Sequence, residues 1–163
     1  MEMEKIHIEY INNQFIVRRG SDKYPRGKIL DPLEVAYLLH EDRAIVFGDG
    51  GKILTLRDLA SMYADKKEWW LLFTVLHDLY KRGRIARRGF GENDLILERE
   101  GKRYQIYVTE ENVIVSVNEL LEWIDKTFAK NMIPVIAVVD MYGDVTYYKA
   151  SKHTFKKIDK GEM

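Results

Sequence analysis

Residues 133–148 constrain the fold most strongly, because they form the pattern of two strands joined by a tight turn. Residues 135–139 are an unbroken apolar run, which is typical of a strand buried on both faces. An acidic turn with the sequence Asp-Met-Tyr-Gly-Asp follows, and its glycine can adopt positive φ. Residues 145–148 are β-branched or aromatic and predict a second strand. Such an apolar hairpin needs other elements to cover its strands, and its two carboxylates favour a basic surface opposite the turn.

Composition restricts the class of protein. The chain has 163 residues, enough for one domain or two small ones, and 46% hydrophobic with 12% aromatic residues argues against disorder. The absence of cysteine removes disulfides, thiolate catalysis and cysteine zinc sites. There is no apolar run of membrane-spanning length and the first residues are charged, so we expect a cytoplasmic protein without a membrane partner.

The balance of charge bears on nucleic-acid binding. Lys plus Arg and Asp plus Glu number 26 each, whereas a protein that binds RNA alone usually carries a positive excess. The sequence therefore predicts RNA binding that is weak, local, or dependent on a partner. The strongest basic cluster contains Lys81, Arg82, Arg84, Arg87 and Arg88. It is compatible with contact to RNA phosphates, with an acidic turn of another subunit, or with a solvated surface.

Hydrophobic periodicity predicts a hairpin at residues 4–18 around Asn12-Asn13, and helices after Asp31-Pro32, after Thr55 and over residues 67–81. Further strands are predicted at residues 44–47, 85–88, 95–97, 104–108 and 113–115. A helix over residues 118–130 should turn Leu120, Leu121, Ile124 and Phe128 inward, and residues 150–163 should be frayed. These elements predict an α+β protein with a boundary between two small units near residues 83–91.

Four sequence segments along the chain resemble those of a known family. They are Asp-Pro-Leu-Glu-Val-Ala-Tyr-Leu-Leu from residue 31, Leu-Tyr-Lys-Arg-Gly from residue 79, Asp-Leu-Ile-Leu from residue 94, and the terminal hairpin VIAVVDxxGDxxYY. Together they resemble the archaeal tRNA-splicing endonuclease family. The resemblance implies an N-terminal α/β domain over residues 1–83. It also implies a C-terminal mixed-sheet domain of the endonuclease-like (restriction-endonuclease-like) kind over residues 84–163.

The same resemblance implies a chemistry without metal or cofactor. A ribose 2′-hydroxyl attacks the adjacent phosphate of precursor tRNA at a bulge–helix–bulge, leaving a 2′,3′-cyclic phosphate and a 5′-hydroxyl. The family uses a tyrosine, a histidine and a lysine for this displacement, which needs a base, an acid and a cation. The matching positions here hold Glu98, Gly101 and Met132. The expectation is a catalytically inactive structural subunit that assembles with a catalytic chain, two of each, and meets precursor tRNA through that complex.

The resemblance also implies where the subunits meet. The turn with Asp140, Gly143 and Asp144 should dock in a basic cleft of a neighbouring subunit. Val135, Val145 and Tyr147 lie on the strands expected to pair with another hairpin. Arg84, Arg87, Arg88 and Lys130 are the candidates for contact with RNA or a partner.

Two active alternatives stay open from the sequence. His153 lies near Tyr147, Tyr148 and Lys152, which would be a relocated catalytic set for RNA cleavage. Asp94, Glu100 and Lys102 follow the Asp…Glu-x-Lys pattern of metal-dependent nucleases, although the spacing is short for two neighbouring strands. A nucleic-acid-binding module without an enzyme partner is a third possibility, against which the zero net charge argues.

Overall fold

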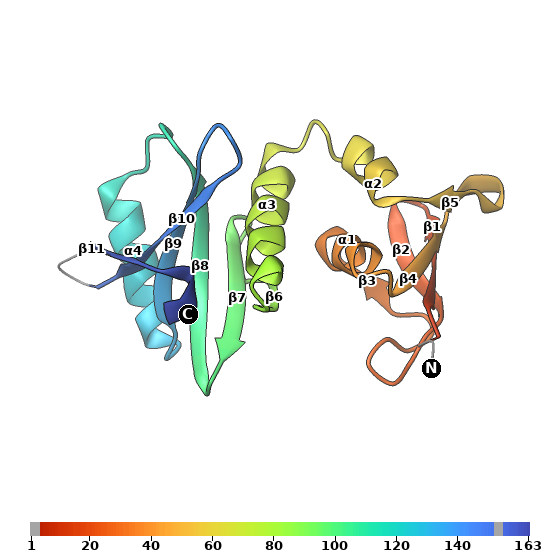
Figure 1. Cartoon of the computed structure of the whole chain (residues 1–163), viewed down its shortest axis with the longest axis horizontal. Helices are drawn as coiled ribbons and strands as arrows, with labels where there is room; N and C mark the ends of the chain where they lie inside the picture. Colours follow the sequence, from red (N-terminus) through yellow and green to blue (C-terminus); the bar gives the residue numbers. More distant parts are fainter. Residues whose placement is uncertain (1–3, 152–154) are drawn as a thin grey trace. The chain divides into compact units, whose positions relative to one another are not determined.

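The computed structural model describes residues 4–151 and 155–163, and it divides into two compact units, Met1–Lys67 and Glu68–Met163. Each unit has its own β-sheet and its own helices (Figure 1). The predicted α+β class is confirmed. Within the described residues, no helix combines the length and the apolar character that crossing a membrane requires.

The first unit is built on a five-stranded sheet. Its order is β3 (Ile29–Leu30), β2 (Gln14–Arg19), β1 (Ile6–Ile11), β4 (Ala44–Phe47) and β5 (Ile53–Leu54). The predicted hairpin is confirmed: β1 and β2 pair antiparallel across Asn12 and Asn13, whose φ values are 52° and 60°. Asparagine tolerates this left-handed conformation better than most residues, which suits a two-residue hairpin turn.

Both helices of this unit begin at the residues that the sequence indicates. Asp31 accepts a hydrogen bond from the backbone N–H of Leu33 (2.8 Å) and caps α1 (Pro32–His40). Thr55 and Asp58 form a capping box at the start of α2 (Leu56–Met62). The hydrogen bonds that Asp58 accepts from Thr55 lower the pKa of its carboxyl, because they stabilise the charged form.

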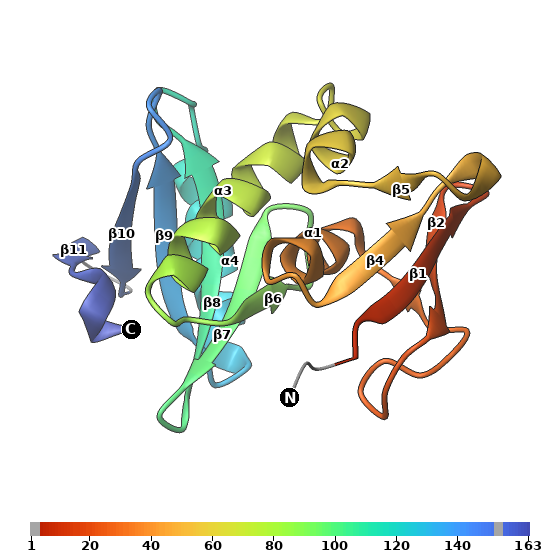
Figure 2. The same ribbon diagram turned by 45° about the vertical axis from the view of Figure 1, so that its right-hand side comes forward.

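The second unit is built on a six-stranded sheet. Its order is β11 (Phe155–Ile158), β10 (Val145–Ala150), β9 (Ile133–Val139), β8 (Lys102–Glu110), β7 (Asp94–Arg99) and β6 (Ala86–Arg88). Among the described strands of this sheet, β8 and β9 alone pair in parallel, and α4 (Val117–Ala129) connects them. In Figures 1 and 2, α4 covers one face of this sheet and α3 (Lys67–Lys81) covers the other. The run 135–139 thus lies between two helices, as its apolar character predicts.

Helix α3 has the predicted bounds, and Gly83 follows it with a φ of 72°. Its buried face consists of Trp69, Leu72, Val75, Leu76 and Leu79. Asp78 on this helix accepts hydrogen bonds from Tyr147 on β10 (2.7 Å) and from Lys160 (2.9 Å). These contacts explain why α3 belongs to the same compact unit as the β9–β10 hairpin. The division between the units therefore lies at the start of α3, whereas the sequence predicted a boundary after its end, near residues 83–91.

Two predictions near α4 are wrong. Residues 113–115 form a loop rather than a strand, and Ile114 is 97% exposed. Leu121 and Phe128 are exposed, while Thr127 is fully buried beside Ile124. The apolar spacing alone suggested a wider buried face, but the partners beneath α4 are polar as well as apolar.

The expectation of a frayed tail is also wrong. Residues 155–158 form β11 along β10, and a short 3₁₀ turn, η2 (Lys160–Glu162), follows. Ile158 and Met163 are buried, at 7% and 1% exposed. The tail is polar in composition, yet strand pairing with β10 and the burial of two apolar side chains hold it against the second unit.

Candidate functional site

The hairpin tip, residues 140–144, is a rigid turn built around Asp140. The carboxylate of Asp140 accepts hydrogen bonds from the backbone N–H groups of Tyr142 (2.8 Å) and Asp144 (3.0 Å). Gly143 has a φ of 80°, a conformation that other side chains rarely adopt. The Asp140 carboxylate therefore shapes the turn, and Asp144 is the more exposed of the two aspartates.

Two large side chains of the tip, which the sequence analysis treated only as turn residues, project into solvent. Met141 is 83% exposed and Tyr142 is 81% exposed. A methionine and a tyrosine between two aspartates in a tight turn are the signal that sequence reasoning overlooked. Exposed apolar and aromatic groups on a rigid turn suit contact with a partner better than contact with water.

The strand residues predicted for the interface lie inside the second unit. Val135, Val145 and Tyr147 are at most 5% exposed, and the Tyr147 hydroxyl donates to Asp78 Oδ2 (2.7 Å). Burial, reinforced by the Asp78 carboxylate, raises the pKa of Tyr147 far above its ordinary value. The side chains of these three residues pack in the core, so the interface prediction now rests on the tip.

The three positions that match the family's catalytic residues lie around the turn that joins β7 to β8. This turn is at the end of the sheet opposite the hairpin tip. Glu98 pairs with Arg103 on β8 (3.1 Å), and both side chains are exposed. Gly101, with Glu100, forms the two-residue turn between these strands, with φ values of 75° and 52°. Met132 is buried at 3% exposed. The positions thus present a paired carboxylate, a glycine and a buried thioether.

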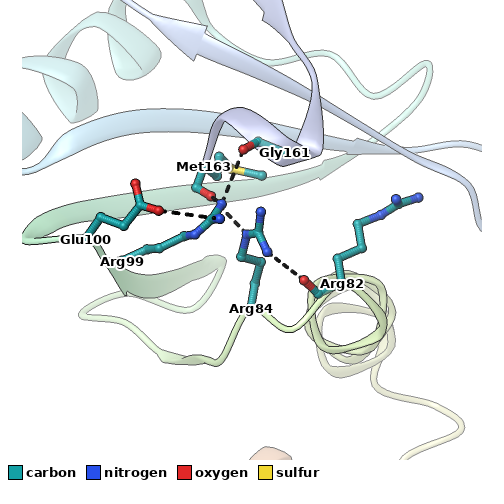
Figure 3. A network of polar contacts seen from close by, with 6 residues as sticks. All are labelled: Arg82, Arg84, Arg99, Glu100, Gly161 and Met163. Carbon is teal, nitrogen blue, oxygen red and sulfur yellow. Dashed lines mark hydrogen bonds and ion pairs between the residues drawn. The ribbon is translucent and has the colours of Figure 1, made fainter.

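Part of the basic cluster is engaged by the tail. Arg84 donates from Nε to the main-chain oxygen of Met163 (2.9 Å) and from Nη1 to that of Arg82 (2.6 Å). Arg99 also donates to the Met163 oxygen and pairs with Glu100 (3.7 Å). Figure 3 shows this network, from which the Arg82 guanidinium points away.

The other predicted contact residues have different surroundings. Arg87 is exposed on β6 and Arg88 is partly buried. Lys130 is exposed at the end of α4, where its ammonium lies 4.3 Å from the ring centroid of Phe90.

The structure contradicts a metal-dependent nuclease site formed by Asp94, Glu100 and Lys102. Asp94 begins β7 and pairs with Tyr107, while Lys102 pairs with Arg99 at the other end of the strand. Asp94 and Arg99 are the two ends of the six-residue strand, about 17 Å apart. Across residues 4–151 and 155–163, no three histidine or carboxylate side chains gather as a metal site.

Of the two tyrosines in the relocated set, Tyr147 is buried and bonded to Asp78, whereas Tyr148 is partly buried. His153 and Lys152 lie outside the described residues.

These features define an α+β protein of two units, the second with a mixed six-stranded sheet and an acidic hairpin tip. The chain is 31% identical over 144 residues to a tRNA-splicing endonuclease of Thermococcus onnurineus (strain NA1), covering 84% of each chain. The same identity and coverage relate it to a tRNA-splicing endonuclease of Pyrococcus furiosus (strain ATCC 43587 / DSM 3638 / JCM 8422 / Vc1). No protein-family model matches. The chain belongs to the tRNA-splicing endonuclease family.

Proposed function

We propose that this chain is the structural, catalytically inactive subunit of a heteromeric tRNA-splicing endonuclease that removes introns at bulge–helix–bulge sites. It assembles with a catalytic chain, two of each, and holds two active sites at the separation that a precursor tRNA requires. The family membership supports the role in tRNA splicing. The heteromeric assembly and the inactive role are the proposal.

The observation that carries the proposal is the state of the three matching positions. A general base or acid needs a titratable side chain within reach of the reacting oxygens, and a phosphorane needs a cation. Gly101 has no side chain, Met132 is buried, and Glu98 is bound to Arg103. Gly101 and Met132 therefore supply neither a titratable group nor a cation, and the exposed Glu98 carboxylate, paired with Arg103, is the one titratable group at the three positions.

The hairpin tip supports the assembly. Residues 133–148 carry two carboxylates and no lysine or arginine, and Glu110 and Glu111 lie where β8 ends beside β9. This end of the sheet would repel RNA and attract a cationic surface. A basic cleft on the catalytic chain is the partner that fits, with Met141 and Tyr142 as apolar anchors between the charges.

Cleavage of a bulge–helix–bulge RNA in EDTA tests the proposal, using this chain alone, a candidate catalytic chain alone, and the mixture. We expect cleavage to a 2′,3′-cyclic phosphate and a 5′-hydroxyl only in the mixture. Cleavage by this chain alone would overturn the inactive role. A mixture that forms no complex and no product would overturn the subunit role.

A further inference from the structure

A pocket on the α4 face of the second unit has features of a ligand site. Its volume is about 370 Å³, within the range of roughly 300–1,000 Å³ that is usual for small-ligand pockets. Six of the side chains that line it are those of Phe90, Glu92, Tyr107, Trp123, Lys126 and Lys130, and Asn93, Asp94 and Gln105 line it as well. Three aromatic rings and two ammonium groups thus converge on one space.

The aromatic wall is arranged and partly open. Tyr107 and Trp123 meet edge to face, with ring centroids 5.4 Å apart. Phe90 is 64% exposed, and Lys130 lies over its ring at 4.3 Å. An exposed phenylalanine beside an ammonium offers a flat surface for stacking together with a positive charge.

A buried polar network fixes the walls of the pocket relative to one another. The Asp94 carboxylate accepts hydrogen bonds from the backbone N–H groups of Phe90 (3.0 Å) and Gly91 (2.6 Å) and from the side-chain amide of Gln105 (2.7 Å). The Gln105 oxygen accepts from the hydroxyl of Thr127 on α4 (2.9 Å). All three side chains are at most 3% exposed. The loop that carries Phe90 and the helix that carries both lysines are therefore held in place before a ligand arrives.

The two lysines are available for an anion. Lys126 and Lys130 are exposed and four residues apart, so they lie on the same side of α4. The ion pairs described for the second unit use Arg99, Arg103 and Lys160 instead. Glu92, another lining residue, offers an acceptor for an exocyclic amino group.

We propose that the α4 pocket, lined by these six residues, binds one unpaired nucleotide of RNA. The base stacks on Phe90 beside Trp123, and Lys126 and Lys130 contact its phosphates. Base stacking with cation contacts is the usual way in which proteins hold single-stranded nucleic acid. The inference rests on the proposed function only in naming RNA as the ligand. It adds a substrate contact on the subunit that does no chemistry.

The test measures binding of a fluorescently labelled bulge–helix–bulge RNA by the purified chain in about 50 mM salt. We expect Phe90→Ala to weaken binding about tenfold, the loss of one stacked base, and Phe90→Trp to restore it. Lys130→Gln should weaken binding and lower the salt dependence by about one phosphate contact. Tyr142→Ala and Lys157→Gln are the matched controls, because they remove an exposed ring and an exposed charge elsewhere.

A photoreactive 5-bromouridine in the bulge adds a positional readout, since the cross-link should map to the peptide with Phe90 or Trp123. Equal losses in the Phe90 and Tyr142 variants, or no RNA binding by the wild-type chain, would overturn the proposal. So would a Phe90 variant that binds RNA normally but associates poorly with the catalytic chain, which would make the pocket a protein-docking site. Cleavage by the mixture is a separate measurement, so the proposed function and the pocket can fail independently.

Discussion

At the scale of single residues, the Asp94 carboxylate joins three segments of the second unit. The loop from Gly89 to Gly91 wraps closely around it, and a Cβ added at Gly89 would lie 2.2 Å from Asp94 Oδ2. The carboxylate is 2% exposed, so each hydrogen bond it accepts offsets part of the cost of burying its charge. Glycine at position 89 is required by this close approach, because any side chain would displace the carboxylate.

Gly89→Ala should therefore destabilise the protein by about 2–3 kcal/mol, through the loss of hydrogen bonds to a buried carboxylate. Gly161→Ala is the control, since a Cβ there meets nothing within 4 Å. Urea denaturation followed by circular dichroism measures both. Equal stability of the two variants would contradict the central role of Asp94.

Tyr24 in the first unit makes stability depend on high pH. Burial, with a further contribution from Glu34, raises its pKa from 10.0 to about 12. The folded state keeps the phenol neutral, so this stabilisation is complete below pH 10 and is lost as pH rises from 10 to 12. The loss should reach about 2–3 kcal/mol, and Tyr24→Phe should remove it. Urea midpoints for both proteins from pH 9 to 12 test this, and parallel pH curves would contradict it.

At the scale of elements, the tail behaves as part of the core. Strand β11 extends the sheet beyond β10, while Lys160 reaches Asp78 on α3. Met163, at 1% exposed, lies beside Arg84 and Arg99, which both donate to its main-chain oxygen (Figure 3). The tail thereby links the end of α3, β7 and β10, and it occupies an arginine that the sequence had offered to RNA or a partner.

Substitution of two methionines tests this packing role of the tail and the docking role of the tip separately. Met163→Ala should cost about 2 kcal/mol, because it removes a buried side chain. Met141→Ala should change stability by less than about 0.5 kcal/mol, since Met141 is 83% exposed. Thermal and urea unfolding of both variants provide the measurement. A larger loss of stability in the Met141 variant than in the Met163 variant would contradict the packing role of Met163.

At the scale of the whole molecule, a net charge of zero is compatible with two surfaces of opposite charge on the second unit. The tip and the end of β8 are acidic, and the C-terminal turns of α4 carry the lysines of the α4 pocket. A structural subunit needs both kinds of surface if it docks on a cationic protein and also meets RNA. The net charge of the chain therefore does not describe the local charge of either surface.

The docking of the tip predicts a coupled loss of assembly and cleavage. Asp140→Asn with Asp144→Asn removes both charges, while an amide oxygen can still accept the two backbone hydrogen bonds of the turn. We expect association with the catalytic chain to weaken about tenfold at low salt, and the difference from wild type to narrow as salt screens the wild-type contacts. Light scattering and cleavage assays measure the two effects. Unchanged assembly would contradict docking through the tip.

We propose that the two units are separate domains and that α3 belongs to the second. The fragment 68–163 should fold cooperatively, whereas the fragment 84–163 lacks the buried face of α3 and the Asp78 contacts. Circular dichroism and thermal unfolding of both fragments test this. Folding of the shorter fragment alone would restore the boundary near residues 83–91.

The sequence alone determined much of the local structure of this protein. Caps at Asp31 and Thr55, the Asn12-Asn13 turn, the bounds of α3 and the β9–β10 hairpin follow from interactions between residues close in the chain. The family membership also follows from the sequence, because it rests on matching residues.

Only the tertiary structure decided which side chains are free to act. Val135, Val145 and Tyr147 proved to be core residues, and Arg84 is bound by the tail. Asp94 on β7 and Lys102 on β8 lie at opposite ends of the paired strands. The pocket beside Phe90 joins residues from a loop, a strand and a helix that no sequence pattern connects. Burial and long-range contact depend on how the elements pack, and that information is spread over the whole unit.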